Sequence, residues 1–237
     1  MVNLGQRWRM SVKRLVDIVA SAGGLVVLSP ILALTAIALL VGQGRPILFR
    51  QRRPGLRGVP FTIMKFRTMR VPRPGEVAYR TDEQRVTRLG RGLRASSIDE
   101  LPELWNVLRG EMSIVGPRPL LMEYLDAYTP RQRQRHKMRP GVTSWAAVNG
   151  RHVLPFDERI ELDVWYVDHW SLQLDLRTIA MTVRQVLSRT HVSTTQDPAE
   201  IGFPLPGMAP RPTDHVAPAG SASLTSQNKT DPQRGGR

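Results

Sequence analysis

The chain has 237 residues, which is enough for one ordinary domain with a real core and some additional segments, but not for a second large domain. It contains no cysteine, which excludes disulfides, thiolate nucleophiles and cysteine-ligated metals. Its 34 Lys and Arg against 20 Asp and Glu give a net charge of +14, which predicts an anionic partner: nucleic acid, a phospholipid surface or a phosphorylated substrate.

An uncharged apolar run occupies residues 18–41, long enough for a helix of about 20 residues to cross the hydrocarbon core of a bilayer. Basic residues flank it on both sides, so both of its ends favour the cytoplasm. Ser29 and Pro30 interrupt the run, because proline removes a helical hydrogen bond and a serine hydroxyl can satisfy part of the freed backbone. We therefore favour a re-entrant helix-break-helix hairpin over a straight transmembrane helix. A signal peptide is the weakest alternative, because no small-residue cleavage site ends the run.

Charged residues precede this run at helical spacing. Asp17 follows Arg14 by three positions and Lys13 by four, so it can pair with either cation and be stabilised at the membrane interface. An ordinary solvated charge that ends the apolar run explains the pattern equally well.

Residues 46–69 predict two short strands joined by a turn rich in Pro and Gly. Lys65 and Arg67 follow at the end of the second strand, at alternating positions that share one face. They form a phosphate site if more cations converge there, and are otherwise solvated surface charges.

Two adjacent carboxylates, Asp99 and Glu100, stand just before Pro102. Proline is tolerated only in the first turn of a helix, so a helix should begin at about residue 98 or 99. Its free N–H groups and its dipole would keep both carboxylates ionised and favour a phosphate.

Helix capping is the ordinary explanation for such a pair. However, Arg94 precedes it, and Arg118 follows between two prolines. Among cations, an ionised Asp can be a nucleophile on phosphorus and a Glu can hold a divalent metal.

A combined signature spans about residues 12–187. It consists of KRLVDI, the Ser29–Pro30 break, KFRTM, LRASSIDELPELWNVLRGEMSIVGPRPLL, RPGVTSWAAVNGR and ELDVWYVDHWSLQLDL. Together these segments resemble the bacterial sugar transferases, also called monotopic phosphoglycosyl transferases. The chain matches the compact form of that family, which lacks the extra N-terminal membrane helices of longer relatives.

The resemblance implies a mixed, helix-rich α/β fold at the bacterial inner (cytoplasmic) membrane. A basic flank at 1–14 and the re-entrant membrane hairpin at 15–43 precede a small catalytic domain on the cytoplasmic face at 44–189. That domain should contain a short β-hairpin and amphipathic interfacial helices. Residues 190–237, rich in Pro, Gly, Ser and Thr, are expected to form a flexible tail that is dispensable for chemistry.

The implied activity is transfer of a sugar-1-phosphate from a UDP-sugar to polyprenyl (undecaprenyl) phosphate, with release of UMP. This reaction initiates exopolysaccharide, O-antigen or glycoconjugate assembly. In the family, the Asp of the Asp-Glu pair attacks the sugar-bearing phosphate and forms a phosphosugar–enzyme intermediate, a role that maps onto Asp99. Glu100 maps onto the Mg²⁺ ligand. Lys65, Arg94 and Arg118 map onto cations near the phosphates, and Arg67 joins this set through its place beside Lys65.

The segment at residues 141–151 departs from the family pattern. Ser144 and Ala147 stand where many relatives have Gly and Gln, so no sugar or base contact is carried over there. Asn149 and Arg151 remain candidates for nucleotide or sugar binding, against an equally good explanation as turn residues.

Two further patterns bear on the membrane. Residues 128–140 concentrate Arg and Lys, either as a solvated helix face or as a surface for anionic lipid head groups. Apolar residues at helical spacing from Leu172 to Val186 predict packing in the core first, and interfacial docking second.

Two other classes of function compete with a transferase. A membrane-tethered nucleic-acid-binding protein would explain the charge, but no recognition helix or RNA-binding motif is recognisable, so nucleic acid is not an expected partner. A non-catalytic scaffold for glycan assembly would keep the fold without turnover. The predicted partners are thus a UDP-sugar, polyprenyl phosphate and an anionic phospholipid membrane, with a homodimer left open.

Overall fold

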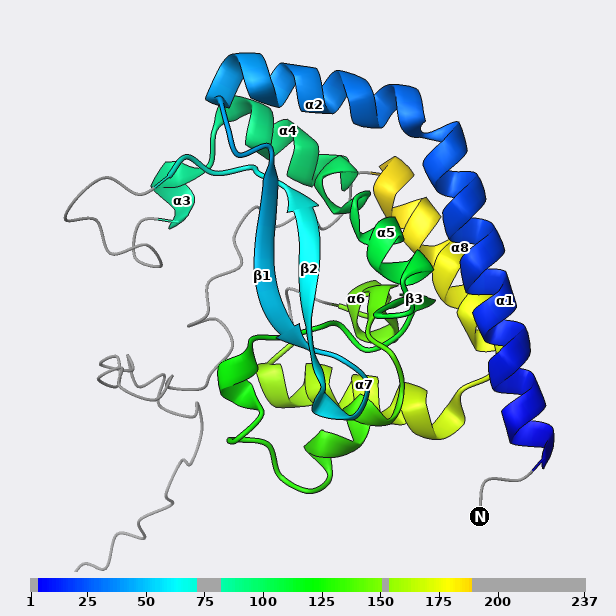
Figure 1. Ribbon diagram of the computed structural model, residues 1–237. Coiled ribbons are helices and arrows are strands. Elements are labelled where there is room, and N and C mark those ends of the chain that lie inside the picture. Colours follow the sequence, from blue (N-terminus) through cyan, green and yellow to red (C-terminus); the bar gives the residue numbers. More distant parts are fainter. Residues whose placement is uncertain (1–3, 72–81, 151–153, 189–237) are drawn as a thin grey trace, which may run out of the picture.

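The computed structural model describes residues 4–71, 82–150 and 154–188 of the chain. Arg151 and the expected tail at 190–237 lie outside the described residues. The described part is mixed and helix-rich, as predicted, and it contains two small sheets, of which one is the predicted hairpin (Figure 1).

Two helices, α1 (Leu4–Val27) and α2 (Ser29–Gln43), meet at the predicted break and are bent by 60°. The Ser29 hydroxyl donates to the carbonyl of Val26 at 2.8 Å, and Pro30 lies in the first turn of α2, where its missing N–H costs little. Figure 1 shows α2 along the top of the molecule and α1 down one side. Within the described ranges, no one helix has the length and apolar character to cross a membrane, whereas this bent pair has both when taken together.

The predicted β-hairpin is present as β1 (Leu48–Pro54) and β2 (Pro60–Phe66), which pair antiparallel around the short 3-10 helix η1 (Leu56–Gly58). Alternate residues of β2, Phe61 and Ile63, pack against Val107 and Met112. A second sheet pairs β3 (Ser113–Val115) in parallel with β4 (Gly141–Thr143). The hairpin therefore presents one face to the core, and Lys65 lies near its open end.

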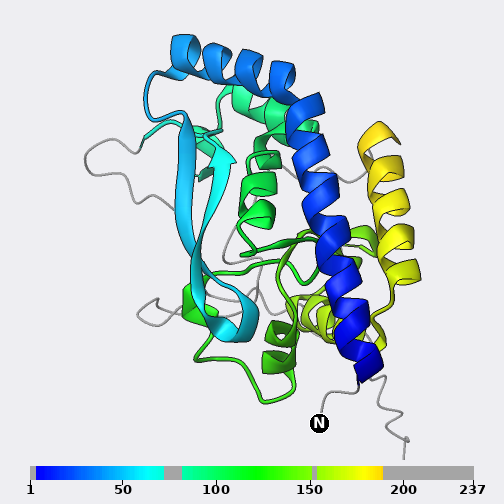
Figure 2. The same cartoon turned by 45° about the vertical axis from the view of Figure 1, so that its right-hand side comes forward.

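Short helices connect these strands, and two longer helices close the described chain. They are α3 (Asp82–Arg85), α4 (Arg88–Ala95), η3 (Ile98–Glu100), α5 (Glu103–Leu108), η4 (Met122–Tyr124), η5 (Gln132–Lys137), α6 (Trp145–Val148), α7 (Phe156–His169) and α8 (Leu172–Ser188). Ile160 and Val164 of α7 pack on Tyr124 and Tyr128. Figure 2 shows α5 and α8 on opposite sides of α1.

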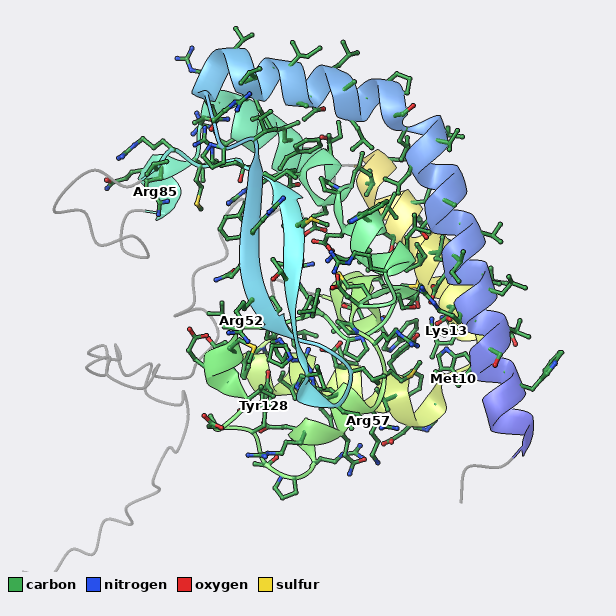
Figure 3. The ribbon with its side chains drawn as sticks, in the orientation of Figure 1. Met10, Lys13, Arg52, Arg57, Arg85 and Tyr128 are labelled. Atoms are coloured by element: carbon green, nitrogen blue, oxygen red, sulfur yellow. The ribbon has the colours of Figure 1, made fainter. Side chains whose placement is uncertain are left out.

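The expected local pairing of Asp17 with Lys13 or Arg14 is wrong. The Lys13 ammonium instead points into the molecule (Figure 3), where it donates to Asp175 Oδ2 of α8 at 2.6 Å and to the carbonyl of Val115 at 3.0 Å. Both members of the Lys13–Asp175 pair are buried. Burial strengthens such a pair relative to a one-turn surface contact, so the tertiary partner determines the arrangement.

Asp17 and Arg14 also contact the rest of the protein rather than each other. Asp17 Oδ1 accepts from the Ser113 hydroxyl and from the N–H of Ile114, both at 3.0 Å. Arg14 donates to two consecutive carbonyls at the C-terminus of α5, at 2.6 and 2.9 Å, where a cation is favoured. As a result, α1 is fixed to α5, β3 and α8 at once.

The sequence favoured core packing for the apolar residues of α8, but not all of them enter the core. Ile179 packs against the cluster around Tyr166, but Leu176 is 66% exposed and Val183 is 52% exposed. The second alternative, docking at a membrane interface, stays a prediction for these exposed residues.

The basic run at residues 128–140 is not a free cationic face. Arg131 forms ion pairs with Glu161 and Asp168 of α7, at 2.6 and 2.7 Å. Arg135 is 1% exposed and forms a buried ion pair with Asp163. The run therefore joins η5 to α7, and part of its charge is already neutralised.

Candidate active site

Asp99 and Glu100 lie in the single turn of η3 and not at the start of a longer helix. The sequence predicted a helix from residue 98 or 99, but α5 begins at Glu103 with Pro102 as its N-cap. Ser97 enters the turn with φ +56°, a left-handed conformation that turns the chain sharply before the carboxylates. Because α5 has only six residues, side-chain cations rather than a helix dipole must balance the two carboxylates.

Glu100 is the point at which three segments converge. Its Oε1 accepts from Lys65 Nζ of β2 at 2.6 Å and from Arg118 Nη2, after β3, at 2.9 Å. Burial acts to lower the pKa of Arg118, but Glu100 and Glu103 outweigh it, so the pKa is raised. The guanidinium therefore stays charged, and Lys65 and Arg118 meet at one carboxylate.

Asp99 is 8% exposed, and within the described residues its carboxylate makes no hydrogen bond. Burial raises its pKa, and Glu100 raises it further, while Lys65, Arg94 and Arg118 oppose the rise. A carboxylate that is desolvated yet faces cations is both more basic than usual and able to ionise. These are the properties that a carboxylate nucleophile needs.

Arg94 reaches the same region from the last turn of α4. Its Nε donates to the Thr68 hydroxyl at 2.9 Å, just beyond β2. The approach depends on Gly90, because a Cβ built there would lie 2.0 Å from the carbonyl oxygen of Thr68. Thr87 caps α4 by accepting from the N–H of Gly90 at 2.9 Å. These contacts place the charge of Arg94 close enough to Asp99 to affect its pKa.

Arg67 does not join Lys65 at the carboxylates. Its guanidinium donates to the carbonyls of Gln43, Gly44 and Arg45 at 2.6, 2.9 and 3.3 Å. Strand β2 ends at residue 66, so the alternation that predicted a shared face no longer applies to Arg67. Arg67 therefore donates hydrogen bonds to the carbonyl groups at the C-terminus of α2 and just beyond it.

The sequence reading missed a third carboxylate, Glu103, which is 2% exposed and lies 3.0 Å from Lys65 Nζ. Burial raises its pKa to about 7; Lys65 opposes the rise and Glu100 adds to it. The spacing gave a signal, because Glu103 follows Asp99 by four residues, and such residues share a helix face. Lys65 therefore lies between two carboxylates.

A Mg²⁺ ion fits this site only together with a phosphate. No group of three or more His, Asp or Glu side chains within the described ranges is arranged to hold a metal ion. Mg²⁺, however, is commonly held by one or two carboxylates plus the oxygens of a substrate phosphate. Glu100 and a neighbouring carboxylate would supply the oxygen ligands of that arrangement.

Asn149 and Ser144 have local roles. Asn149 is the C-cap of α6 and donates to the carbonyl of Trp145 at 2.8 Å, which agrees with the turn explanation. Ser144 caps the other end, accepting from the N–H of Ala147 at 3.0 Å. Arg151, the other candidate, lies outside the described residues.

Comparison with known proteins identifies the family. A family model described as bacterial sugar transferase matches residues 8–189. The "uncharacterized sugar transferase EpsL" of Bacillus subtilis strain 168 is 48% identical over 186 residues, which cover 78% of this chain and 92% of EpsL.

Two further relatives carry the name UDP-glucose:undecaprenyl-phosphate glucose-1-phosphate transferase. The protein from Caulobacter vibrioides is 44% identical over 186 residues, covering 74% of this chain and 70% of the relative. The protein from Escherichia coli K12 is 38% identical over 185 residues, covering 72% of this chain and 39% of the relative. Since the family model spans most of the described chain, including every cation and carboxylate of the site, the protein belongs to the bacterial sugar transferase family.

Proposed function

We propose that this protein transfers a sugar-1-phosphate from a UDP-sugar to undecaprenyl phosphate. The names of its relatives support this pair of substrates. The observation that carries the chemistry is the convergence of Lys65 and Arg118 on Glu100, beside the buried carboxylate of Asp99. When a diphosphate substrate binds, its phosphates can replace the carboxylates as hydrogen-bond partners of these cations.

In the first step, an oxygen of Asp99 attacks the phosphorus that bears the sugar. The bond from this phosphorus to the bridging oxygen breaks, and its electron pair leaves with UMP. The product is a phosphosugar joined to Asp99 as an acyl phosphate. Lys65, Arg94 and Arg118 stabilise the charge that develops on the phosphate oxygens. Glu100 would hold a Mg²⁺ ion, and that ion would neutralise charge on the leaving phosphate.

In the second step, a phosphate oxygen of undecaprenyl phosphate attacks the same phosphorus. The bond to Asp99 breaks and its carboxylate is restored, giving the lipid diphosphate sugar. Neither step needs a general base at the attacking oxygen, because both nucleophiles are already anions. This fits a site in which the charges that act most strongly on Asp99 are those of Glu100, Lys65, Arg94 and Arg118.

Exposed apolar side chains support a location at the membrane. On α1 and α2 they are Trp8, Leu15, Val16, Ile18, Val19, Val26, Val27, Ile31, Leu34, Ile37, Leu40 and Val41. In our proposal the bent pair enters the bilayer from the cytoplasmic face and returns to it, while the exposed apolar residues of α8 lie at the interface. This would hold the site at the surface where the phosphate of a polyprenyl lipid lies.

UMP release tests this function. Purified protein is incubated with Mg²⁺, undecaprenyl phosphate and each of a panel of UDP-sugars, beside Asp99→Asn and the control Asp126→Asn, which changes an exposed carboxylate. We expect UMP release from the wild type and the control with one or a few donors, and its near-complete loss in Asp99→Asn. Release by Asp99→Asn at the wild-type rate would contradict the proposed mechanism. Absence of release from the wild type with all donors would favour a scaffold.

A further inference from the structure

Arg53 lies near the end of β1, in the strand that pairs with the one carrying Lys65. Its guanidinium is largely buried and donates to Gln51 Oε1 at 2.6 Å, while its Nε is buried without a hydrogen-bond partner. Over the described ranges, no carboxylate lies within ion-pair distance of Arg53. A buried cation without an anionic partner is costly, so its retention calls for an explanation.

The surroundings of Arg53 make its charge less favourable still. Burial, and next the charge of Arg118, lower the pKa of Arg53 to about 10, and Glu123 and Glu103 offset this only in part. Arg118 differs, because Glu100 contacts it directly. One of two neighbouring guanidinium groups is therefore neutralised by a contacting carboxylate, and the other is not.

The backbone brings the two arginines to the same place. Pro54, the last residue of β1, and Arg118 line one small hollow, together with Pro117 and Pro119. The flanking prolines restrict the backbone on both sides of Arg118, and strand pairing restricts it at Arg53. Arg53 pairs with Phe61, so by strand alternation it shares a face of the hairpin with Lys65, and it lies close enough to Arg118 for the two charges to interact.

We propose that Arg53 binds a phosphate of a substrate together with Arg118, and is a further phosphate-binding residue of the transfer reaction proposed above, on which this inference rests. A phosphate accepts bidentate hydrogen bonds from guanidinium groups and neutralises their mutual repulsion. Two phosphates can supply this chemistry: the one that leaves with UMP, and the one on the polyprenyl acceptor. Both present the same oxygens to Arg53.

Direct titration distinguishes these two sources. UMP and a short-chain polyprenyl phosphate are titrated separately into the full chain in lipid nanodiscs, for the wild type and for Arg53→Gln. The matched control is Arg52→Gln, the adjacent exposed arginine labelled on β1 in Figure 3, which removes the same charge. A charge-assisted hydrogen bond contributes about 1.5–3 kcal/mol, so Arg53→Gln should weaken one of the two ligands by roughly 10- to 100-fold. Arg52→Gln should weaken neither.

Measuring adduct formation and adduct discharge separately shows in which of the two steps Arg53 binds phosphate. If Arg53 holds the UMP phosphate, Arg53→Gln raises the UDP-sugar concentration needed to form the adduct on Asp99, and leaves discharge of a preformed adduct unchanged. If it holds the acceptor phosphate, the pattern is reversed. Arg53→Lys keeps the charge but loses the two-pronged geometry, and should fall between wild type and Arg53→Gln.

A purely structural role for Arg53 predicts that Arg53→Gln lowers the unfolding midpoint, whereas our proposal predicts that it does not. Since its charge is buried without a contacting carboxylate, Arg53→Gln should fold with an unfolding midpoint at or above that of the wild type. Unchanged affinity of Arg53→Gln for both ligands would overturn the proposal, whether its unfolding midpoint is lowered or unchanged. Failure of the wild type to release UMP would instead count against the proposed function, and the two titrations would still decide whether Arg53 binds phosphate.

Discussion

Replacing Glu103 by Gln should remove one part of the pH dependence of the unfolding free energy. Burial raises the pKa of Glu103 from 4.5 to about 7, although Lys65 lies close enough to oppose the rise. Because the folded value exceeds the unfolded one, folding takes up a proton between them, and the resulting stabilisation is complete below pH 4.5. It is lost as the pH rises through about 7. The gap corresponds to about 3 kcal/mol of unfolding free energy, an upper figure because Lys65 and Glu103 titrate together.

The glutamine side chain has the same shape and does not titrate, and Lys65 keeps its contact with Glu100. The unfolding free energy of Glu103→Gln minus that of the wild type should therefore rise by up to about 3 kcal/mol between acid and mildly alkaline pH. Denaturant unfolding in detergent across this range measures the difference. Glu158→Gln, an exposed position of α7, is the control and should show no comparable trend. A difference for Glu103→Gln that stays constant with pH would show that Glu103 does not titrate with a raised pKa in the folded protein.

Three further changes have defined outcomes. Arg135→Gln leaves the buried carboxylate of Asp163 without its cation and should lower the unfolding free energy by about 3–5 kcal/mol in denaturant titrations; a loss below 1 kcal/mol would contradict this. Gly90→Ala places a methyl group 2.0 Å from the carbonyl oxygen of Thr68, so α4 must move, and adduct formation should slow; an unchanged rate would count against the placement of α4. Burial, and next Arg135, lower the pKa of His136 from 6.5 to about 4, so its contribution to stability should be present above pH 6.5 and lost as the pH falls toward 4. His136→Gln should remove this decrease in the thermal midpoint between pH 6.5 and 4. If the decrease persists in the variant, other groups cause it.

Local features were predictable where neighbouring residues determine the outcome. Ser29 and Pro30 break the helix because proline restricts the backbone wherever it occurs, and the β-hairpin follows from a turn between two short runs. The convergence of Lys65 and Arg118 was predictable only through the resemblance to a family. The residues lie in distant segments, and spacing alone does not bring such segments together.

Tertiary contacts decided the remaining features. Asp17 satisfied a helical pairing rule, yet it accepts hydrogen bonds from β3, a segment that lies far away in the sequence. Arg67 lies just past the strand whose alternation was used to orient it. In α8 the periodic residues Leu176 and Val183 are exposed while Asp175 is buried, because Lys13 compensates its charge. An apolar stripe identifies a face that avoids water, but it does not say whether protein or lipid covers that face.

The proposed mechanism requires that Asp99 becomes covalently attached to a phosphosugar. The most direct measurement is the intact-protein mass after incubation with Mg²⁺ and a panel of UDP-sugars, without polyprenyl phosphate, for wild type and Asp99→Asn. We expect a mass increase equal to one sugar phosphate on the wild type alone, and its loss when polyprenyl phosphate is added. An equal increase on Asp99→Asn, or UMP release in the complete reaction with no adduct even under rapid quenching, would contradict the proposed mechanism.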